Sequence, residues 1–344
     1  FWAAIVSATS PLVALAAHSV SADLLTTLWV ALATAAFWHG FARRSPVSLL
    51  AMWVFLGLGL LTKGPPALLV PAVSMPVAAF SLWRGRFWRP GAAWLLGGLA
   101  LFVGVGLGWY AVEAEHTSGL FSYWIGQELV ARNVSGAMHR NPAFSYAVAV
   151  YVPLLLLGTG PWLLLALWRG RPWWEWFRND SIHGNWLRAA RHSLLAGVAI
   201  PFVVFSLSRS KLPLYLVPLF VPLSLILGRM LAVLLAQKRL RRQWACGWMA
   251  LLFVLIIVAK GAAGFIDDSH DMTRLASAIA PRLTREEPRQ LYSVTRLPLN
   301  GLEFHLGRLI EPVPSETFFA HMIRGERAGQ AANYIVKKKD WVRM

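Results

Sequence analysis

Basic side chains stand in three short polar intervals that separate long apolar stretches of this chain. The intervals are Leu61–Pro66, Trp109–Pro142 and Ser208–Tyr215. Arginine binds phosphate through a planar fork of donors, and lysine binds it as a point charge. Next to so much apolar sequence, such cations suit the phosphate of a lipid headgroup. If the three intervals share one membrane face, they favour one anion site over three separate helix anchors.

Lys63, Arg209 and Lys211 are the candidate phosphate ligands of the first and third intervals. Lys63 is followed by Gly-Pro, so a tight turn exposes its ammonium group between two apolar stretches. Tyr215 adds a phenol to the two cations of the third interval. The alternative for each of these side chains is to anchor a helix end by extending toward water.

Glu128 and Arg132 lie four residues apart in the middle interval, so on a helix they share one face. That spacing would hold the Arg132 fork toward a phosphate, or it would make only an exposed ion pair that adds little stability. The interval also contains residues that could join Glu128 in binding a divalent metal: Glu113, Glu115, His116 and His139. They do not have the compact H-E-x-x-H spacing, so a metal site stays open.

Asp23 is the first residue of the second apolar stretch. An ionisable residue at a membrane boundary is a candidate functional residue. The alternative is a structural role, because aspartate is favoured at the start of a helix, where it caps free N–H groups and complements the helix dipole. The sequence leaves both interpretations of Asp23 open.

The composition is that of a polytopic membrane protein. Of the 344 residues 57% are hydrophobic and 14% are charged, against about 25% charged residues in soluble proteins. The 18 tryptophans suit membrane interfaces. The net charge of +17 does not indicate a nucleic-acid partner, because the basic residues gather in alternate loops. No P-loop, dinucleotide-binding or G-x-S-x-G motif is present, and Cys246 is the only cysteine.

Nine apolar segments approach the length of a membrane helix, about 20 residues. They are 1–17, 23–42, 47–61, 66–83, 92–112, 143–168, 193–207, 212–235 and 243–262. The loops 43–46, 84–90, 169–192 and 236–242 carry fourteen basic residues, and the loops on the other side carry five. The positive-inside rule places the richer loops in the cytoplasm. Asp23 and the three polar intervals then share the outer face, which is the periplasm or cell exterior in a bacterium or a lumen in a eukaryote; the resemblance described below favours the periplasmic side of a bacterial inner membrane.

The composition becomes polar and mixed after Gly264. We therefore predict a transmembrane domain over 1–264, which is an all-α bundle, and a small α/β domain over 265–344 outside the membrane. In the second domain we expect a helix at 271–283, strands at 290–295 and 308–313 with a turn or short helix at 300–306 between them, and 334–336 as a candidate for a further strand. The chain begins with Phe1 inside an apolar segment, which predicts that a preceding part of the protein is missing.

Several short motifs occur in an order that resembles the GT-C glycosyltransferases of family 39 type, which use lipid-linked sugars. Within that group the chain is most similar to the bacterial aminoarabinose transferases that act on lipid A. The motifs are Ser21-Ala-Asp23-Leu-Leu, Gly59-Leu-Leu-Thr-Lys63-Gly-Pro65, Trp109-Tyr110, Tyr123…Glu128…Arg132, His139-Arg-Asn-Pro142, Gly160-Pro-Trp162 and Ser210-Lys-Leu-Pro-Leu-Tyr215. Together they cover about residues 1–230.

The resemblance implies transfer of a sugar from a polyprenyl-phosphate donor to a lipid, glycan or protein acceptor of the cell envelope. It implies that Arg132, Lys211 and Tyr215 hold the donor phosphate and that Lys63 supports them. Asp23 would be a secondary acid, while the main catalytic acid would lie in a first outer loop that this chain lacks. On this view the chain alone is inactive.

The resemblance also implies supporting roles for Glu128 and His139 in the middle interval. The aminoarabinose transferases usually carry Glu-His where this chain has Glu128-Leu129, so a likely metal ligand is lost and an acceptor other than lipid A is equally consistent. No cofactor is certain. A transporter or flippase of an anionic polyprenyl lipid is the alternative function, although the chain has no internal repeat of the kind that transporters show.

Overall fold

The fold was analysed in a computed structural model. The residues that it describes are 1–19, 21–84, 88–124, 126, 143–168, 184–263, 265, 272–283, 290–294, 300–313, 318, 321–322 and 332–336. The chain forms two compact units, Phe1–Ala259 and Lys260–Met344. The division falls inside the last turn of a helix, whereas the change of composition lies after Gly264.

The first unit consists of helices. Their bounds are α1 (Trp2–Ala8), α2 (Pro11–Ala17), α3 (Asp23–Arg43), α4 (Pro46–Lys63), η1 (Pro65–Leu68), α5 (Leu69–Arg84), α6 (Ala92–His116), α7 (Leu120–Tyr123), α8 (Phe144–Tyr146), η3 (Ala147–Tyr151), α9 (Val152–Trp168), α11 (Gly184–Leu207), η4 (Pro213–Leu219), α12 (Phe220–Ala236) and α13 (Arg242–Ala263). Eight helical stretches among the described residues are long and apolar enough to cross a membrane. The prediction of an all-α polytopic membrane protein is confirmed.

The prediction of a membrane helix over 1–17 was wrong. That segment forms α1 and α2, each of seven residues, which are separated at Thr9 and Ser10. The break precedes Pro11, which has no N–H to donate and stands at the first position of α2, where a helix accepts proline best. Ser10 accordingly has an extended backbone, with φ −73° and ψ 125°. The other eight predicted segments each overlap one of the eight long helical stretches, but α11 begins at Gly184, nine residues before the predicted start at residue 193.

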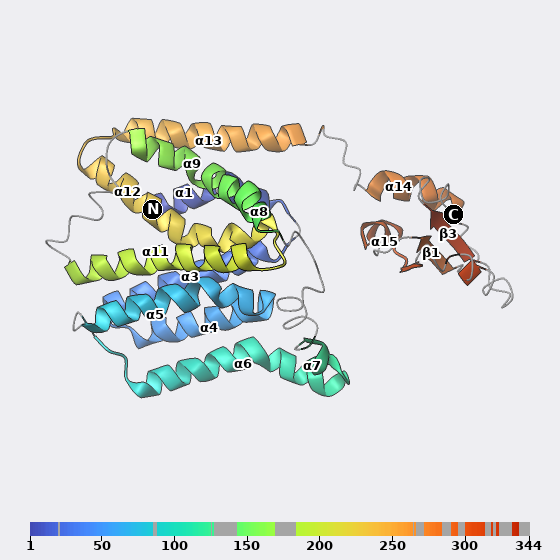
Figure 1. The fold of residues 1–344 in the computed structure, drawn as a ribbon, viewed down its shortest axis with the longest axis horizontal. Coiled ribbons are helices and arrows are strands. Elements are labelled where there is room, and N and C mark those ends of the chain that lie inside the picture. Colours follow the sequence, from blue (N-terminus) through green and yellow to red (C-terminus); the bar gives the residue numbers. More distant parts are fainter. Residues whose placement is uncertain are drawn as a thin grey trace. The chain divides into compact units, whose positions relative to one another are not determined.

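The long helices of the first unit lie side by side in a bundle (Figure 1). Helix α3 packs on α4, α4 on α6, α5 on α11, and α1 on α12. Most apolar side chains of α6 and α13 are exposed, and only Gly98 and Gly106 of α6 are buried. These two helices therefore present the apolar surface that a lipid bilayer would cover.

Gly228 marks the closest approach between α12 and α1. A Cβ atom at Gly228 would lie 2.4 Å from the backbone nitrogen of Ala3, so α1 would have to move. Gly228→Ala is expected to lower the free energy of unfolding by about 1–3 kcal/mol, the usual cost of overpacking. Thermal unfolding in detergent measures this, with Gly247→Ala as control because nothing lies within 4 Å of its Cβ position. An equal effect of both substitutions would contradict the prediction.

The second unit contains a parallel sheet of three strands in the order β2-β1-β3. The strands are β1 (Gln290–Val294), β2 (Ile310–Pro312) and β3 (Ala332–Val336), and the helices are α14 (Met272–Ile279), η5 (Ala280–Arg282) and α15 (Asn300–Leu306). Ala276, Leu291, Leu302 and Ile310 form a buried cluster that joins both longer helices to the sheet. The core is small, as expected for a unit of this length.

Candidate functional site

Asp23 is the first residue of α3 and is buried, with 7% of its surface exposed. The Ser21 hydroxyl donates a hydrogen bond to the Asp23 carboxylate at 3.0 Å. The start of a helix favours a negative charge, so the position suits an ionised carboxylate. Asp23 is also the only acidic residue in the first 112 residues of the chain. No neighbouring carboxylate in that stretch competes for the cations around it.

Lys63 forms an ion pair with Asp23. It is the last residue of α4, and Gly64 ends the helix with φ +76°, a conformation that glycine adopts without strain. Because α3 and α4 pack antiparallel, the end of α4 lies beside the start of α3. The side chain of Lys63 keeps 19% exposure and that of Asp23 keeps 9%. The pair thus lies at the rim of the bundle and can still meet a ligand.

The aromatic ring of Tyr215 completes this contact. The Lys63 ammonium lies over the ring, 4.7 Å from its centroid. Tyr215 belongs to η4, which packs on α3. A cation over an aromatic face is attracted by the ring quadrupole. The structure therefore brings three predicted site residues, Asp23, Lys63 and Tyr215, into one contact from three separate elements.

Lys211 is buried in the loop between α11 and η4, with 1% of its surface exposed. Its ammonium group donates a hydrogen bond to the Ser208 carbonyl at 2.6 Å. Burial lowers the pKa of Lys211, because the charged form loses its hydration. The Ser208 hydroxyl donates to the Ser210 carbonyl at 3.1 Å, which shapes the turn. The loop thus holds a cation in a defined place, four residues before Tyr215.

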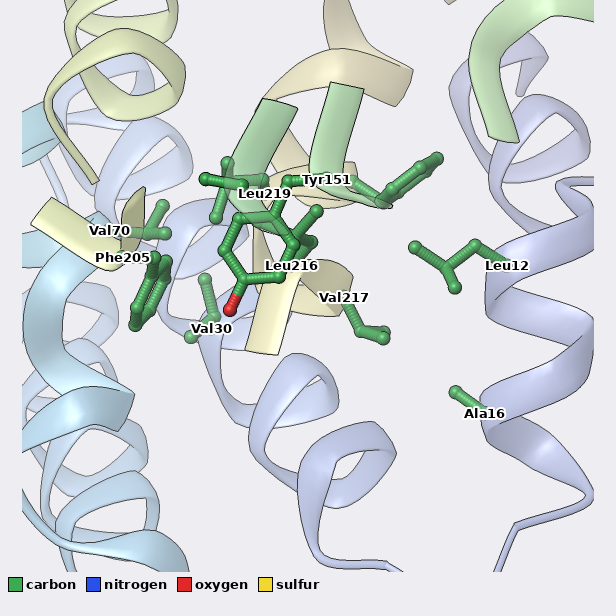
Figure 2. Close-up of a cluster of buried hydrophobic side chains, with 11 residues drawn as sticks. Leu12, Ala16, Val30, Val70, Tyr151, Phe205, Leu216, Val217 and Leu219 are labelled. Atoms are coloured by element: carbon green, nitrogen blue, oxygen red, sulfur yellow. The ribbon is translucent and has the colours of Figure 1, made fainter. Parts of the chain in front are cut away.

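An apolar cluster supports this loop from beneath (Figure 2). Tyr151 lies in it beside Leu216, Val217 and Leu219 of η4 and Val30 of α3. The Tyr151 hydroxyl donates a hydrogen bond to the backbone carbonyl of Leu212 at 3.2 Å. Tyr151 is fully buried, so its ring packs in the core while its hydroxyl fixes the loop. The cluster connects the loop rigidly to α3, which carries Asp23.

The remaining predicted site residues, Glu128, Arg132 and His139, lie outside the described residues. The first part of the Trp109–Pro142 interval is helical, because α6 continues to His116 and carries Glu113 and Glu115. This corrects the expectation that the helix ends at Val112 and that a loop begins at Glu113. Within the part of the chain that the structure describes, no three His, Cys, Asp or Glu side chains lie close enough to hold a metal ion.

Two functional contacts were missed by sequence reasoning. The first is the Tyr151 hydrogen bond to the loop, whose only signal was a polar phenol inside an apolar segment. The second is the hydrogen bond from the Trp29 indole to the Thr62 hydroxyl at 3.0 Å, which joins α3 and α4 next to Lys63. Both are contacts between segments far apart in the chain, and neither has a local sequence pattern.

The amino-acid sequence is similar to those of bacterial aminoarabinose transferases. No protein-family model matches the chain. It is 33% identical over 215 residues to the undecaprenyl phosphate-α-4-amino-4-deoxy-L-arabinose arabinosyl transferase of Erwinia tasmaniensis, a match that covers 60% of this chain and 35% of that protein. It is 34% identical over 216 residues to such a transferase of Sodalis glossinidius, which covers 60% and 36% of the two proteins.

Solved structures agree with the sequence matches. The structure of ArnT from Cupriavidus metallidurans bound to undecaprenyl phosphate superimposes with a TM-score of 0.64 at 18% identity, covering 97% of this chain and 70% of that one. The apo structure gives 0.67 at 17% identity, covering 99% and 74%. The chain is a relative of the GT-C glycosyltransferases. The resemblance recognised in the motifs is thereby confirmed.

This chain spans only part of the length of the proteins that it matches. The matched region is little more than a third of the Erwinia and Sodalis proteins. The structural likeness, at under a fifth sequence identity, establishes the fold. A multi-pass membrane protein with a GT-C bundle is therefore established, and its activity is inferred below.

Proposed function

We propose that the protein of which this chain is a part is a membrane glycosyltransferase. It moves a sugar from a polyprenyl-phosphate donor to a lipid, glycan or protein acceptor. The observation that carries the proposal is the contact of Asp23, Lys63 and Tyr215 at the end of the bundle that also holds the buried Lys211 loop. In the proposal this contact is part of an anion site at an end of the helix bundle, which suits a chain whose relatives are named for an undecaprenyl phosphate donor.

Cations at this site would stabilise the leaving group of the reaction, which is the polyprenyl phosphate. In the transfer, the bond between the sugar's anomeric carbon and the phosphate oxygen breaks, and a bond to the acceptor oxygen forms. Negative charge grows on the leaving phosphate, and fixed cations stabilise it most in the transition state. Lys63, Lys211 and Arg132 would supply this charge, and Tyr215 would orient Lys63. Asp23, the secondary acid of the proposal, would hold Lys63 in position through their ion pair.

The acceptor proton needs a base, and the proposal places that base outside this chain's described site. The resemblance puts the main acid in a first outer loop of the complete protein, where it would take the proton from the acceptor. The Lys and Arg distribution supports a site on the outer face of the membrane, which in the proposal is the periplasmic side of a bacterial inner membrane. Lipid A is one acceptor that fits the proposal. Other acceptors fit it as well, because this chain has Leu129 where the aminoarabinose transferases usually have histidine.

Release of polyprenyl phosphate tests the proposal. The complete polypeptide, in nanodiscs, receives a labelled polyprenyl-phosphate sugar with or without a membrane-lipid extract. We expect extract-dependent release of free polyprenyl phosphate, and a loss of about 100-fold or more in Arg132→Ala. Arg43→Ala, at the opposite end of α3, is the control for lost positive charge.

The outcomes separate the candidate functions. Normal turnover in a folded Arg132→Ala protein would contradict the phosphate role of Arg132. Tight donor binding without release, under any acceptor, would favour the lipid-carrier alternative over the transferase. Release that does not need the extract would point to water or a protein as the acceptor.

A further inference from the structure

Tyr151 is a fully buried tyrosine whose hydroxyl takes no part in the transfer described above. It is the last residue of η3, a π-helical turn between α8 and α9. Pro153 follows two residues later and has no N–H with which to continue α-helical bonding. Single π-helical turns inside α-helices are rare and occur often at functional sites. The hydroxyl of Tyr151 is therefore a candidate for a role in the site.

The Leu212 carbonyl accepts two hydrogen bonds that connect Tyr151 to Tyr215. The Tyr151 hydroxyl donates one at 3.2 Å, and the backbone N–H of Tyr215 donates the other at 3.1 Å. A carbonyl oxygen has two lone pairs, so it can accept from both donors at once. Leu212 has an extended backbone and precedes the first residue of η4. Tyr151 thereby fixes the first turn of η4, which is the turn that carries Tyr215.

The ring of Tyr215 contacts two further elements of the bundle. Phe205 of α11 lies beside it, with ring centroids 6.2 Å apart, and the Lys63 ammonium of α4 lies 4.7 Å from its centroid. Tyr215 is half-buried and the side chain of Lys63 keeps 19% exposure, so a ligand can reach this contact. A cation is attracted by an aromatic ring only when it lies over the ring face, within about 6 Å of the centroid. The position of Lys63 thus depends on the orientation of the first turn of η4.

Apolar packing alone does not fix the rotation of this turn. Leu216, Val217 and Leu219 of η4 pack with Tyr151 (Figure 2), but apolar burial is non-directional. The η4 turn also has few donors of its own, because Pro213 and Pro218 carry no N–H. A hydrogen bond is directional, since it weakens steeply as its angle departs from linear. The Tyr151 hydroxyl therefore supplies the directional contact that the turn needs.

We propose that Tyr151 is a positioning residue of the transferase site. Through the Leu212 carbonyl its hydroxyl orients the Tyr215 ring, and the ring holds the Lys63 ammonium toward the donor phosphate. This inference rests on the proposed function, since the donor is the ligand that Lys63 serves. It assigns no contact between Tyr151 and the donor, because Tyr151 is buried beneath the loop.

Tyr151→Phe tests the proposal, because it removes the hydroxyl and keeps the ring. The complete polypeptide in nanodiscs binds a labelled polyprenyl-phosphate hexose, and we expect the dissociation constant to rise about tenfold, a factor that a cation–aromatic contact can supply. Tm should fall by only about 2–4 °C, because the Leu212 carbonyl keeps its bond from the Tyr215 N–H. Thr159→Val is the matched control. It also removes a buried hydroxyl of this helix, but that hydroxyl bonds to the Leu155 carbonyl within α9.

Double variants show whether Tyr151 acts through the Tyr215 ring. Tyr215→Leu keeps the backbone N–H and removes the ring, so Tyr151→Phe should not weaken donor binding further in that background. Tyr215→Phe keeps the ring, so the effect of Tyr151→Phe on donor binding should remain. Equal effects of Tyr151→Phe in the original protein and in both backgrounds would overturn the proposal. The hydroxyl would then serve only the stability of the bundle.

The reactivity of Lys63 gives a second readout that needs no donor. Acetylation of Lys63 by acetic anhydride in the donor-free protein is followed by peptide mass spectrometry. The rate should rise several-fold in Tyr151→Phe, because the displaced ring no longer covers the amine, and should stay unchanged in Thr159→Val. An unchanged rate in Tyr151→Phe, or an equal rise in Thr159→Val, would overturn the proposal. If the original protein binds no donor, the proposed function fails, while the acetylation rates still decide whether Tyr151 positions Lys63.

Discussion

Replacing Lys63 by methionine in the complete polypeptide is expected to cost both stability and transfer. The change leaves the Asp23 carboxylate buried without its partner. Breaking a fully buried ion pair costs about 3–5 kcal/mol, and the partial exposure of Lys63 reduces this to about 2–4 kcal/mol. The change also removes one cation from the proposed phosphate site, so transfer should fall about 100-fold or more.

The double variant Asp23→Asn with Lys63→Met separates these two effects. It removes the stranded charge, and the new amide can still bond with Ser21, so much of the lost stability should return. Transfer should stay low, because the cation is still absent. Lys260→Met is the matched control, since Lys260 also lies in the last turn of a long helix but is exposed. Its stability and transfer should remain close to the original values.

Thermal unfolding and donor turnover, measured on the original protein and the three variants, check the prediction. If transfer returned together with stability in the double variant, Lys63 would act only by holding α3 and α4 together. If Lys63→Met turned over normally, the phosphate assignment of Lys63 would be wrong. A loss in Lys260→Met as large as in Lys63→Met would show that any lysine at this end of the bundle matters equally.

The long helices could be predicted from sequence because hydropathy reports the part of a helix that lies in hydrocarbon. Hydropathy does not report how far a helix continues beyond the hydrocarbon. Helix α6 therefore extends past the predicted limit, Val112, to His116, carrying Glu113 and Glu115 on a helix rather than in a loop. The break before Pro11 could not be predicted from hydropathy either, because Pro11 begins a new helix while Pro76, Pro161 and Pro201 lie inside continuous ones.

The site was predicted as separate residues rather than as a cluster. Asp23, Lys63 and Tyr215 each stood out as a polar residue at the end of an apolar segment. Their contact depends on the antiparallel packing of α3 and α4 and on the position of η4, which joins residues far apart in the chain. No spacing in the sequence records that packing. The burial of Lys211 was hidden for the same reason, because a lysine beside a helix end is usually exposed.

Donor binding is expected to weaken as the pH rises. The loss should begin at a lower pH than it would if Lys211 had the pKa of an ordinary lysine. Burial lowers the pKa of Lys211 in the free protein, because its ammonium loses hydration. A phosphate beside the ammonium would stabilise the charged form and raise that pKa again. Binding above the free-protein pKa is therefore coupled to proton uptake. Affinity should be full below that pKa and should fall as pH rises through it.

A polyprenyl-phosphate hexose is the suitable probe, because a phosphate diester with a neutral sugar keeps one negative charge across this range. Binding is measured between about pH 7 and pH 10, below the ordinary lysine pKa of about 10.4. Lys211→Arg should give a flatter profile, since arginine stays charged throughout. The two proteins differ only at position 211, so the difference between the two profiles belongs to Lys211.

Lys211→Met completes the comparison, because it should bind weakly at every pH and lose the slope that Lys211 causes. Thermal unfolding of each variant confirms that the buried position accepts the new side chain. Parallel profiles for the original protein and Lys211→Arg would show that Lys211 does not face the phosphate. Its hydrogen bond to Ser208 would then serve only to shape the loop. If donor affinity instead fell more steeply with pH in the original protein than in Lys211→Arg, the buried ammonium would lie at the donor phosphate. The phosphate would then offset the free energy that the ammonium loses on burial.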